Sequence, residues 1–407
     1  MSKNNKDNRS MEIKPKIETF ARIKVLGIGG SGTSAVNRMS QLGIRGVEFI
    51  AINTDAQALH NNQADRKVHI GKNITKGLGS GMNPELGRQA AEESVEELEE
   101  VIGNADMVFI TCGLGGGTGT GAAPVVAELS KTRGILTVAV VTKPFTFEGS
   151  KRKEVAETGY DNLKDQVDAI ISIHNDRILQ IIDKKTSLID AFKTVDEVLR
   201  QGISGISDLI TTHGVVNADF ADVRSIMQDA GTALMGIGRA SGENRASEAA
   251  KLAINSPLLE LAIDGAKGVL FNITGGQNLG MFEIDEAAKV ITKSIDPDGK
   301  VKFGAVIDEE MGEEVRITVI ATGFDEANKR SSLPGLSFVE EPKKSSVSES
   351  RQSTQQPAQE VRKPLFNPKP IEPIRSMDAP EEEAASQPNL GGDDELDIPA
   401  FIRKKMK

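Results

Sequence analysis

A run of seven glycine and threonine residues, Gly115–Gly121 (G-G-G-T-G-T-G), has the composition of a loop that binds phosphate. The apolar run Met107–Cys112 before it predicts a buried strand, and the small and aliphatic residues Ala122–Leu129 after it predict a helix. Glycines let backbone N–H groups come close to an anion, and the amino end of a helix adds a favourable dipole. Thr118 and Thr120 can add hydroxyl donors. We therefore expect a phosphate-binding loop between a strand and a helix.

A second glycine-rich loop, Gly27–Gly32, follows the apolar run Ile23–Leu26 and matches the pattern G-x-G-x-x-G. Asp55 lies near the end of the next predicted strand, where a dinucleotide-binding fold places its acidic residue. By itself this loop predicts an NAD-dependent enzyme, which is the alternative from another class of function. Such an enzyme has no use for the phosphate loop at Gly115–Gly121. The P-loop pattern G-x-x-x-x-G-K-[ST] occurs nowhere in the chain.

Three polar residues at short spacing, Asn217, Asp219 and Asp222, are the candidates for chemistry on a bound phosphate. Glycine loops bind a nucleotide but do not activate water, whereas phosphoryl transfer needs a group that positions the nucleophile. Asp219 and Asp222 are spaced to share one face of a helix. The plainer interpretation of the isolated motif is that Asn217 caps this helix, and that the two acids favour the positive end of its dipole.

Alternating strand and helix patterns must position these residues. Helices are predicted from the first glycine loop to Leu42 and from Pro84 to just before Gly103, with Asn83 as N-cap and Pro84 at the first helical position. This alternation predicts a largely parallel sheet that is covered on both faces. The predicted strands of this sheet are 23–26, 49–52, 107–112, 136–141 and 169–173.

A long helical pattern runs from Leu188 to about Thr212 and separates this sheet from a second set of elements. The two last predicted strands of that second set follow each other without a helix, which predicts a smaller mixed sheet. Its predicted strands are 233–237, 269–273, 301–307 and 315–321, and its predicted helices are 244–254 and 284–295.

The chain resembles the tubulin/FtsZ superfamily, and in particular the FtsZ proteins of bacterial cell division. The loop Gly115–Gly121 is the signature of that superfamily. Further matching stretches are Ala51–Asp55, Thr146–Gly149, Asn217–Asp222 and Val319–Phe324. The resemblance extends from about residue 23 to residue 324 and resumes in the last dozen residues.

The resemblance implies an α/β, tubulin-like fold. A Rossmann-like GTP-binding domain with a parallel sheet would occupy residues 21–212 and include the long central helix. That helix would join it to a smaller α+β activating domain with a mixed sheet at residues 213–325.

In this family the first loop covers the α- and β-phosphates of GTP, and the second loop wraps the β- and γ-phosphates. Glu148 would bind the ribose hydroxyls, Arg152 would reach the same nucleotide, and Phe192 would stack near the base. Asp196 would accept hydrogen bonds from guanine N1 and N2. The GTP-binding residues implied are Gly29, Gly30, Ser31, Gly32, Thr33, Ser34, Gly115, Gly116, Gly117, Thr118, Gly119, Glu148, Arg152, Asn175, Phe192 and Asp196.

The first loop departs from the usual family sequence, in which glycines are followed by Asn. Ser31 replaces a glycine where the backbone approaches phosphate, and Thr33 and Ser34 occupy the following positions. A small hydroxyl can still donate to a phosphate oxygen, so we expect binding to survive. The contact that the usual Asn makes with the edge of the base is in doubt. His174 also stands where the family usually has Pro.

The resemblance implies a different role for Asn217, Asp219 and Asp222 from helix capping. In the family this segment enters the nucleotide pocket of the next subunit, where the two carboxylates orient the attacking water and Mg²⁺ helps to neutralise the phosphates. Hydrolysis would then occur only at a head-to-tail contact, and such contacts build filaments of the protein itself. The alternative is a tubulin-like, GTP-dependent filament protein without a role in division.

The two ends of the chain have the composition of disordered segments. Residues 1–20 are polar, and residues 326–395 are rich in Ser, Pro, Gln, Lys and Glu without apolar periodicity. As a flexible coil of about 70 residues, this linker has a root-mean-square span of roughly 45 Å. The final segment, Leu396–Lys407, contains apolar residues that have no core to join, so we expect a docking peptide. In the family, membrane-tethering division adaptors bind this peptide.

The composition of the 407-residue chain argues against several other functions. The net charge is −10, and there is no Trp and only one Tyr to stack on bases, so we expect no nucleic-acid partner. The four histidines lack the spacing of metal ligands, and the single cysteine, Cys112, lies in a predicted buried strand. Neither a signal sequence nor a span of membrane length is present. We expect a cytoplasmic protein without direct membrane insertion, and the resemblance implies the mid-cell division ring.

Overall fold

The computed structural model describes residues 21–44, 46–212, 214, 216, 218–259 and 263–324 of the chain. The predictions for residues 1–20, for the linker 326–395 and for the peptide Leu396–Lys407 lie outside these residues, and so does Asn217. Of the helices in the described part, none is long and apolar enough to cross a membrane.

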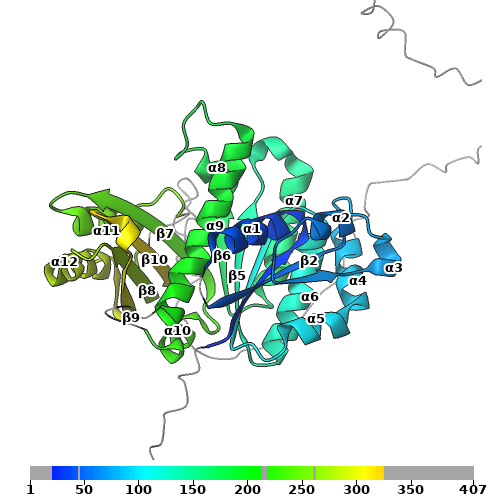
Figure 1. Ribbon diagram of the computed structural model, residues 1–407, viewed down its shortest axis with the longest axis horizontal. Coiled ribbons are helices and arrows are strands. Elements are labelled where there is room, and N and C mark those ends of the chain that lie inside the picture. Colours follow the sequence, from blue (N-terminus) through cyan, green and yellow to red (C-terminus); the bar gives the residue numbers. More distant parts are fainter. Residues whose placement is uncertain are drawn as a thin grey trace, which may run out of the picture. The chain divides into compact units, whose positions relative to one another are not determined.

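In the described part of the chain, ten strands form one sheet with the order β3-β2-β1-β4-β5-β6-β7-β10-β8-β9 (Figure 1). The first seven strands in that order are parallel to one another, and β1–β6 among them form the parallel sheet that was predicted for the first domain. The strands are β1 Ile23–Ile28, β2 Val47–Asn53, β3 Arg66–His69, β4 Met107–Gly113, β5 Leu136–Lys143, β6 Ala169–His174, β7 Gly231–Ser241, β8 Ala266–Gly275, β9 Ile295–Ile307 and β10 Glu314–Thr322.

The helices alternate with the parallel strands and cover both faces of the sheet. They are α1 Gly29–Leu42, α2 Ala56–His60, α3 Lys72–Thr75, α4 Pro84–Glu93, α5 Val95–Ile102, α6 Thr118–Thr132, α7 Ser150–Lys164, α8 Asn175–Ile178, α9 Leu188–Thr211, α10 Phe220–Met227, α11 Arg245–Ile254 and α12 Met281–Thr292. Two short 3₁₀ turns, η1 Thr146–Glu148 and η2 Glu309–Met311, complete the elements.

Two layers of apolar side chains hold the parallel sheet between its helices. Successive residues of a strand point to opposite faces, so Phe109 joins the layer beneath α1 and α9, whereas Ile110 joins the layer beneath α4, α5, α6 and α7. Burial on both faces explains why β4 is apolar almost throughout, in the manner of parallel strands.

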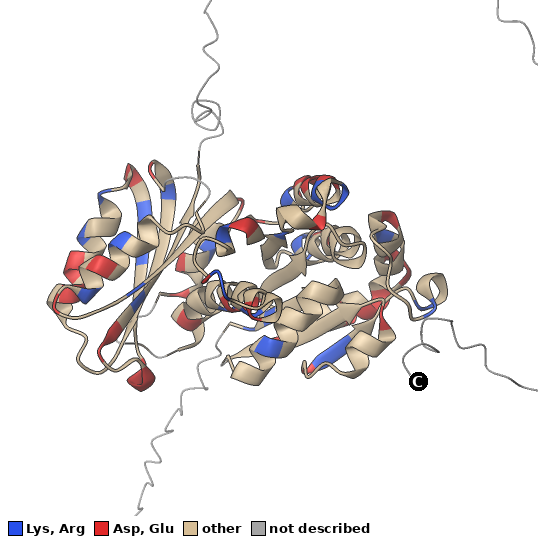
Figure 2. Cartoon of the chain, turned by 90° about the horizontal axis from the view of Figure 1, so that it is seen from above, with Lys and Arg blue, Asp and Glu red and all other residues tan. Residues whose placement is uncertain are grey.

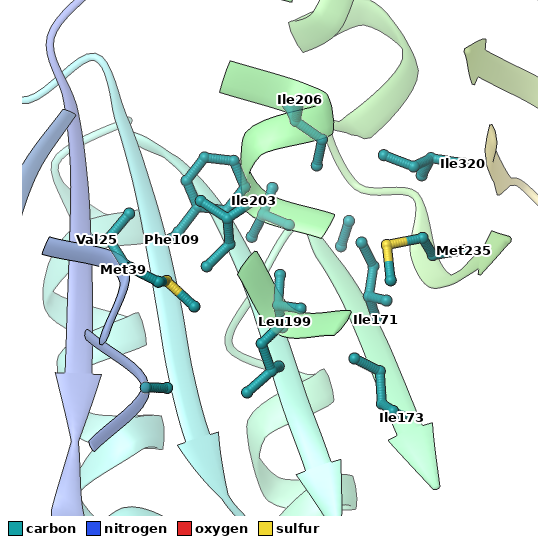
Figure 3. Close-up of a cluster of buried hydrophobic side chains, with 14 of the residues drawn as sticks. Val25, Met39, Phe109, Ile171, Ile173, Leu199, Ile203, Ile206, Met235 and Ile320 are labelled. Atoms are coloured by element: carbon teal, nitrogen blue, oxygen red, sulfur yellow. The ribbon is translucent and has the colours of Figure 1, made fainter. Parts of the chain in front are cut away.

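The central helix α9 packs against strands of both domains. Its residues Leu199 and Ile203 lie against Phe109 of β4, and the same layer continues to Met235 of β7 and Ile320 of β10 (Figure 3). All five side chains are almost completely buried. Helix α9 therefore shares one apolar core with both sets of strands.

The second domain has the predicted mixed sheet. Strand β10 is antiparallel to β7 and β8, whereas β8 is parallel to β9. This sheet is continuous with the first one, because the beginning of β7, Gly231–Ala233, pairs with Ala169–Ile171 of β6.

Basic and acidic side chains are interspersed over the elements of both domains (Figure 2).

The predicted helix between Pro84 and Gly103 is wrong as a single element. Asn83 caps it as expected, accepting from the N–H of Glu85 at 3.1 Å, with Pro84 in the first turn. At Ser94, however, the backbone leaves the helical region, and the chain divides into α4 and α5. The Ser94 hydroxyl accepts a hydrogen bond from the N–H of Gly71 at 3.1 Å, and this contact between distant parts of the chain accompanies the break.

Candidate functional site

The carboxyl ends of the parallel strands surround a cavity of about 430 Å³. Its walls come from the segments after β1, β4, β5 and β6, together with α1 and α9. From β1 the chain adds β2 and β3 on one side of the sheet, and then it adds β4, β5 and β6 on the other side. The point between β1 and β4 is therefore a topological switch point, where α/β sheets bind ligands. Eight of the predicted site residues line this cavity: Gly30, Ser31, Ser34, Glu148, Arg152, Asn175, Phe192 and Asp196.

One face of helix α1 forms a wall of the cavity. Gly30, Ser31 and Ser34 lie on that exposed face, whereas Gly29, Gly32 and Thr33 are buried on the other side. The Thr33 hydroxyl donates to the carbonyl oxygen of Gly29 at 2.8 Å, so it is engaged within the helix. The departure from the family sequence at Thr33 therefore does not put a side chain into the cavity.

The two glycine loops come closest to each other at Gly29 and Gly119. Gly29 has a φ of +73°, and a Cβ at this position would lie 2.7 Å from the backbone nitrogen of Gly119. Only glycine meets both requirements without strain. These two glycines, although predicted to bind the nucleotide, do not line the cavity; they let the loops approach each other.

The second loop leads into α6, whose N-cap is Gly117. The first N–H groups of a helix have no partner within it, so α6 presents donors at the edge of the sheet that holds the cavity. Gly115 has a φ of +90°, and a Cβ there would lie 2.7 Å from the carbonyl oxygen of Arg152. Gly115, Gly116, Gly117 and Thr118 do not themselves line the cavity, whereas Leu114 at the start of the loop does.

The hydroxyl groups of the second loop are held inside the protein. Thr118 shares hydrogen bonds with Thr54 at 2.9 Å and with Ser80 at 2.8 Å. The Thr120 hydroxyl accepts from the N–H of Gly115 at 3.0 Å. Both threonines therefore brace the loop through these bonds, and the Thr120 hydroxyl, which accepts in its bond, still has its own proton to donate.

Glu148 and Arg152 lie together on the wall formed by η1 and α7. The Glu148 carboxylate accepts from the N–H of Phe145 at 2.8 Å, and its second oxygen lies 2.8 Å from Nη1 of Arg152. Both residues line the cavity, so one wall offers a carboxylate and a guanidinium side by side. This pair suits a ligand that carries both hydroxyl groups and anionic oxygens.

Helix α9 contributes Phe192 and Asp196, which lie one turn apart on the face that lines the cavity. Phe192 makes an edge-to-face contact with Phe145, with 5.6 Å between ring centroids, and is half-exposed. The Asp196 side chain is only 12% exposed, and its Oδ2 lies 3.4 Å from Nη1 of Arg38. Burial raises the pKa of Asp196 to about 6, and the charge of Arg38 acts in the opposite direction.

Three buried polar atoms on the cavity walls have no hydrogen-bond partner among the described residues. They are Nε of Arg152, Oδ1 of Asn175 and Nη1 of Arg38, the last of which has an ion pair with Asp196 but no hydrogen bond. Buried polar atoms are rarely left without a partner, so their gathering here indicates that a polar ligand completes the site. A larger cavity of about 560 Å³ between α4, α6 and α7 is lined by Thr120 and Gly121 of the second loop, but it contains no such atom among the described residues.

The sequence interpretation missed seven residues that line the cavity. Arg38 is the most informative of them, because it stands one helical turn beyond Ser34, and this spacing could have revealed it. Thr142 and Pro144 lie at and just after the end of β5. The apolar periodicity of a sequence locates the end of a strand only approximately, so these two residues were not predicted. The seven residues are Arg38, Gly113, Leu114, Thr142, Pro144, Ile189 and Val195.

Asp219 and Asp222 do not line the cavity. Asp219 is the N-cap of α10 and accepts from the N–H of Ala221 at 3.3 Å, so the prediction that Asn217 caps this helix is wrong. Asp222 lies in the first turn of α10, and its Oδ1 is 2.8 Å from Nζ of Lys302 on β9. The Lys302 ammonium holds the pKa of Asp222 below its usual range.

Two family models match most of the described chain. Residues 22–183 match the GTPase domain of the Tubulin/FtsZ family, and residues 231–325 match the C-terminal domain of the FtsZ family. An FtsZ dimer from M. jannaschii is 46% identical to the chain, with a TM-score of 0.73, and the match covers 75% of this chain and 89% of the other. The chain belongs to the Tubulin/FtsZ family.

Solved structures of lower sequence identity share the fold. CetZ2 from Haloferax volcanii, described as a protofilament with GTPγS bound, is 20% identical, with a TM-score of 0.63 over 76% of this chain and 96% of the other. Membership in a family of GTPases makes the NAD-dependent alternative wrong. The G-x-G-x-x-G pattern at Gly27–Gly32 therefore lies in a Tubulin/FtsZ GTPase domain.

The cavity has polar and aromatic groups on several walls. Asp196 can accept from two donors on the edge of the base, Phe192 offers an aromatic face, and Glu148 and Arg152 lie together on another wall. No cluster of acidic, His or Cys side chains that could hold a metal occurs in the described part of the chain. Mg²⁺ ions at nucleotide sites are commonly held by substrate phosphates and by water.

We expect the affinity for GDP to fall as the pH drops below about 6, the pKa to which burial raises Asp196. Only the ionised carboxylate accepts from both N1–H and N2–H of guanine, so a proton bound to Asp196 must leave before the base binds. Calorimetric titration with GDP from about pH 8 to about pH 5 measures this dependence. The variant Asp196→Ala is the control, because it retains only the titration of the nucleotide phosphates. Equal pH dependence in both proteins would contradict the prediction.

Proposed function

We propose that the protein polymerises head to tail and hydrolyses GTP at the contact between successive subunits, and that the filaments form the bacterial division ring. The observation that carries this proposal is the separation of the cavity from Asp219 and Asp222 within one chain. The cavity lies at the carboxyl ends of the parallel strands, whereas α10, which carries both carboxylates, lies at their amino ends.

The position of α10 follows from a hydrogen bond and from the register of the sheet. Nη2 of Arg224 on α10 donates to the carbonyl oxygen of Gly134 at 3.0 Å, and Gly134 stands just before the amino end of β5. Strand β5 contains eight residues and therefore spans roughly 25 Å. A carboxylate at one end of it does not reach a phosphate at the other. Asp222 could act only on a nucleotide held by another subunit.

Exposed apolar side chains occur at the edge where the cavity opens. Strand β8 is antiparallel to β10, β10 is antiparallel to β7, and β7 is parallel to β6, so the carboxyl ends of β8 and β6 lie at the same edge. Helix α12 begins shortly after β8, with Met281 and Phe282 73% and 87% exposed. Large exposed apolar side chains are typical of contact surfaces, which supports a subunit contact at the edge with the nucleotide. The related M. jannaschii protein is described as a dimer.

In the proposed contact, each subunit contributes different groups. The pocket of one subunit holds GTP through the two loops, Glu148, Arg152, Phe192 and Asp196. Asp219 and Asp222 of the next subunit orient the water whose oxygen attacks the γ-phosphorus, while the bond to the bridging β–γ oxygen breaks and GDP leaves. A bound Mg²⁺ would supply positive charge that offsets the charge of the phosphates.

We further propose that the division ring lies in the cytoplasm at mid-cell and that membrane-tethering adaptors bind the peptide Leu396–Lys407. The peptide combines apolar residues such as Phe401 with a basic end, which suits a groove on a partner protein. The alternative, a filament protein without a role in division, differs in its location. Fluorescence microscopy of the tagged protein in dividing cells distinguishes the two, because only a division protein marks the division plane.

The proposed function predicts that the turnover of GTP per subunit rises with protein concentration. A pocket becomes complete only when another subunit docks on it, so dilute protein should bind GTP but hydrolyse it slowly. Measurement of phosphate release over a range of protein concentrations, together with sedimentation of polymer, tests this expectation. A constant turnover per subunit down to concentrations at which no polymer sediments would overturn the shared site.

A further inference from the structure

Lys302 forms an ion pair with one of the two proposed catalytic carboxylates. Its Nζ lies 2.8 Å from Oδ1 of Asp222, and the two side chains are 45% and 34% exposed. Asp222 belongs to the first turn of α10, whereas Lys302 belongs to β9 of the second domain. The pair therefore forms only when α10 and β9, far apart in the sequence, pack against each other.

The contacts around Asp222 make Lys302 the main partner of its side chain. The N–H of Asp222 donates to the carbonyl oxygen of Asp219 at 2.9 Å, and its own carbonyl oxygen accepts from the hydroxyl of Ser225 at 2.9 Å. Both bonds fix the main chain. The carboxylate itself is held mainly by Lys302 through Oδ1, and the backbone N–H of Asp219 is a weaker second donor to it. Lys302 therefore fixes the carboxylate from the side of β9, and the start of α10 holds it from the other side.

The charge of Lys302 has a second consequence at a subunit contact. Asp219 and Asp222 are both acidic, and a triphosphate is strongly negative, so bringing these groups together is opposed by repulsion. Among the described residues, Lys302 is the cation that pairs with either carboxylate. Its charge offsets part of the repulsion at the position where Asp222 would meet the nucleotide.

We propose that Lys302 is a positioning residue of the shared site, which fixes the orientation of the Asp222 carboxylate and offsets its repulsion from the triphosphate of the partner subunit. This inference rests on the proposed function. The lowered pKa of Asp222, which is due mainly to its hydrogen bond with Lys302, agrees with it. The other acidic group that faces this position is Asp219, at the start of the same helix.

The variant Lys302→Met tests the proposal, with Lys300→Met as the matched control. Lys300 is exposed on the same strand and, two residues away, on the same face. In Lys302→Met we expect GTP binding to be unchanged and turnover per polymerised subunit to fall about tenfold, as for the loss of a hydrogen bond to a charged group. Lys302→Arg should recover most of the turnover, and Lys300→Met should behave as the wild type.

The pH dependence of turnover separates a positioning role from a purely structural one. Lys302 lowers the pKa of Asp222, so in Lys302→Met the carboxylate should take up a proton at a higher pH. The acidic limb of the pH–rate profile of polymerised protein should then move to higher pH. A profile and a turnover equal to those of Lys300→Met, or a rise in turnover, would overturn the proposal.

The variant Asp222→Ala, measured beside Lys302→Met, keeps the two conclusions distinct. If Asp222→Ala abolishes hydrolysis and Lys302→Met does not change it, the positioning role is wrong and the shared site stands. If Asp222→Ala hydrolyses GTP at the wild-type rate, the proposed function itself fails.

Discussion

Asp222→Ala should bind GTP as tightly as the wild type and should hydrolyse it about 10²–10³-fold more slowly, which corresponds to about 3–4 kcal/mol in the activation free energy. Its carboxylate lies outside the cavity, so binding should not change, whereas orientation of the attacking water should be lost. Calorimetry with GTP and phosphate release at high protein concentration measure the two effects. The variant should still sediment as polymer, because unhydrolysed GTP keeps each subunit in its assembling state.

Mixtures of two variants provide the sharpest form of this test. Asp222→Ala retains the nucleotide pocket but lacks one of the carboxylates that would complete the pocket of a neighbouring subunit. Asp196→Ala has the opposite defect, because its pocket is altered and its carboxylates at α10 are intact. Each protein alone should be nearly inactive. A contact between the pocket of Asp222→Ala and the α10 carboxylates of Asp196→Ala, however, contains a complete site. Mixing should therefore restore part of the turnover. If the mixture shows only the sum of the two separate rates, the carboxylates do not act between subunits.

The variant Asp196→Ala should lose guanine affinity and specificity. Each hydrogen bond from the base to a charged carboxylate contributes about 1.5–3 kcal/mol, so the loss of two should weaken GTP binding by at least about 10²-fold. ITP lacks the N2 amine, and the wild type should therefore prefer GTP to ITP by about tenfold or more. In Asp196→Ala this preference should fall to nearly one. Calorimetry of nucleotide-free protein with both nucleotides measures the ratio.

Asp190→Ala is the matched control for this variant. Asp190 lies in the first turn of the same helix, outside the cavity, and pairs with the exposed Lys193 at 2.9 Å. Its removal should leave both nucleotide affinities unchanged. If Asp196→Ala still preferred GTP to ITP as strongly as the wild type, Asp196 would not read the edge of the base.

Long periodic segments were predictable from the sequence because their signals are local. The apolar run 107–112 corresponds to β4, and the pattern from Leu188 to about Thr212 corresponds to α9, Leu188–Thr211. The separation of α4 from α5 was not predictable, because it coincides with a hydrogen bond between Ser94 and the distant Gly71. The cap of α10 was assigned two residues too early, since several side chains in that segment can cap a helix.

The sequence by itself determined the family and the kind of ligand. The glycine loops carry this information because their chemistry depends on backbone freedom over a few adjacent residues, and helical spacing was enough to place Phe192 and Asp196 on one face. The tertiary structure decided how these parts meet. It paired Arg38 with Asp196 and Lys302 with Asp222, and it placed the cavity and α10 at opposite ends of the strands. Such relations join residues far apart in the chain, so they depend on strand order and direction, which no local pattern encodes.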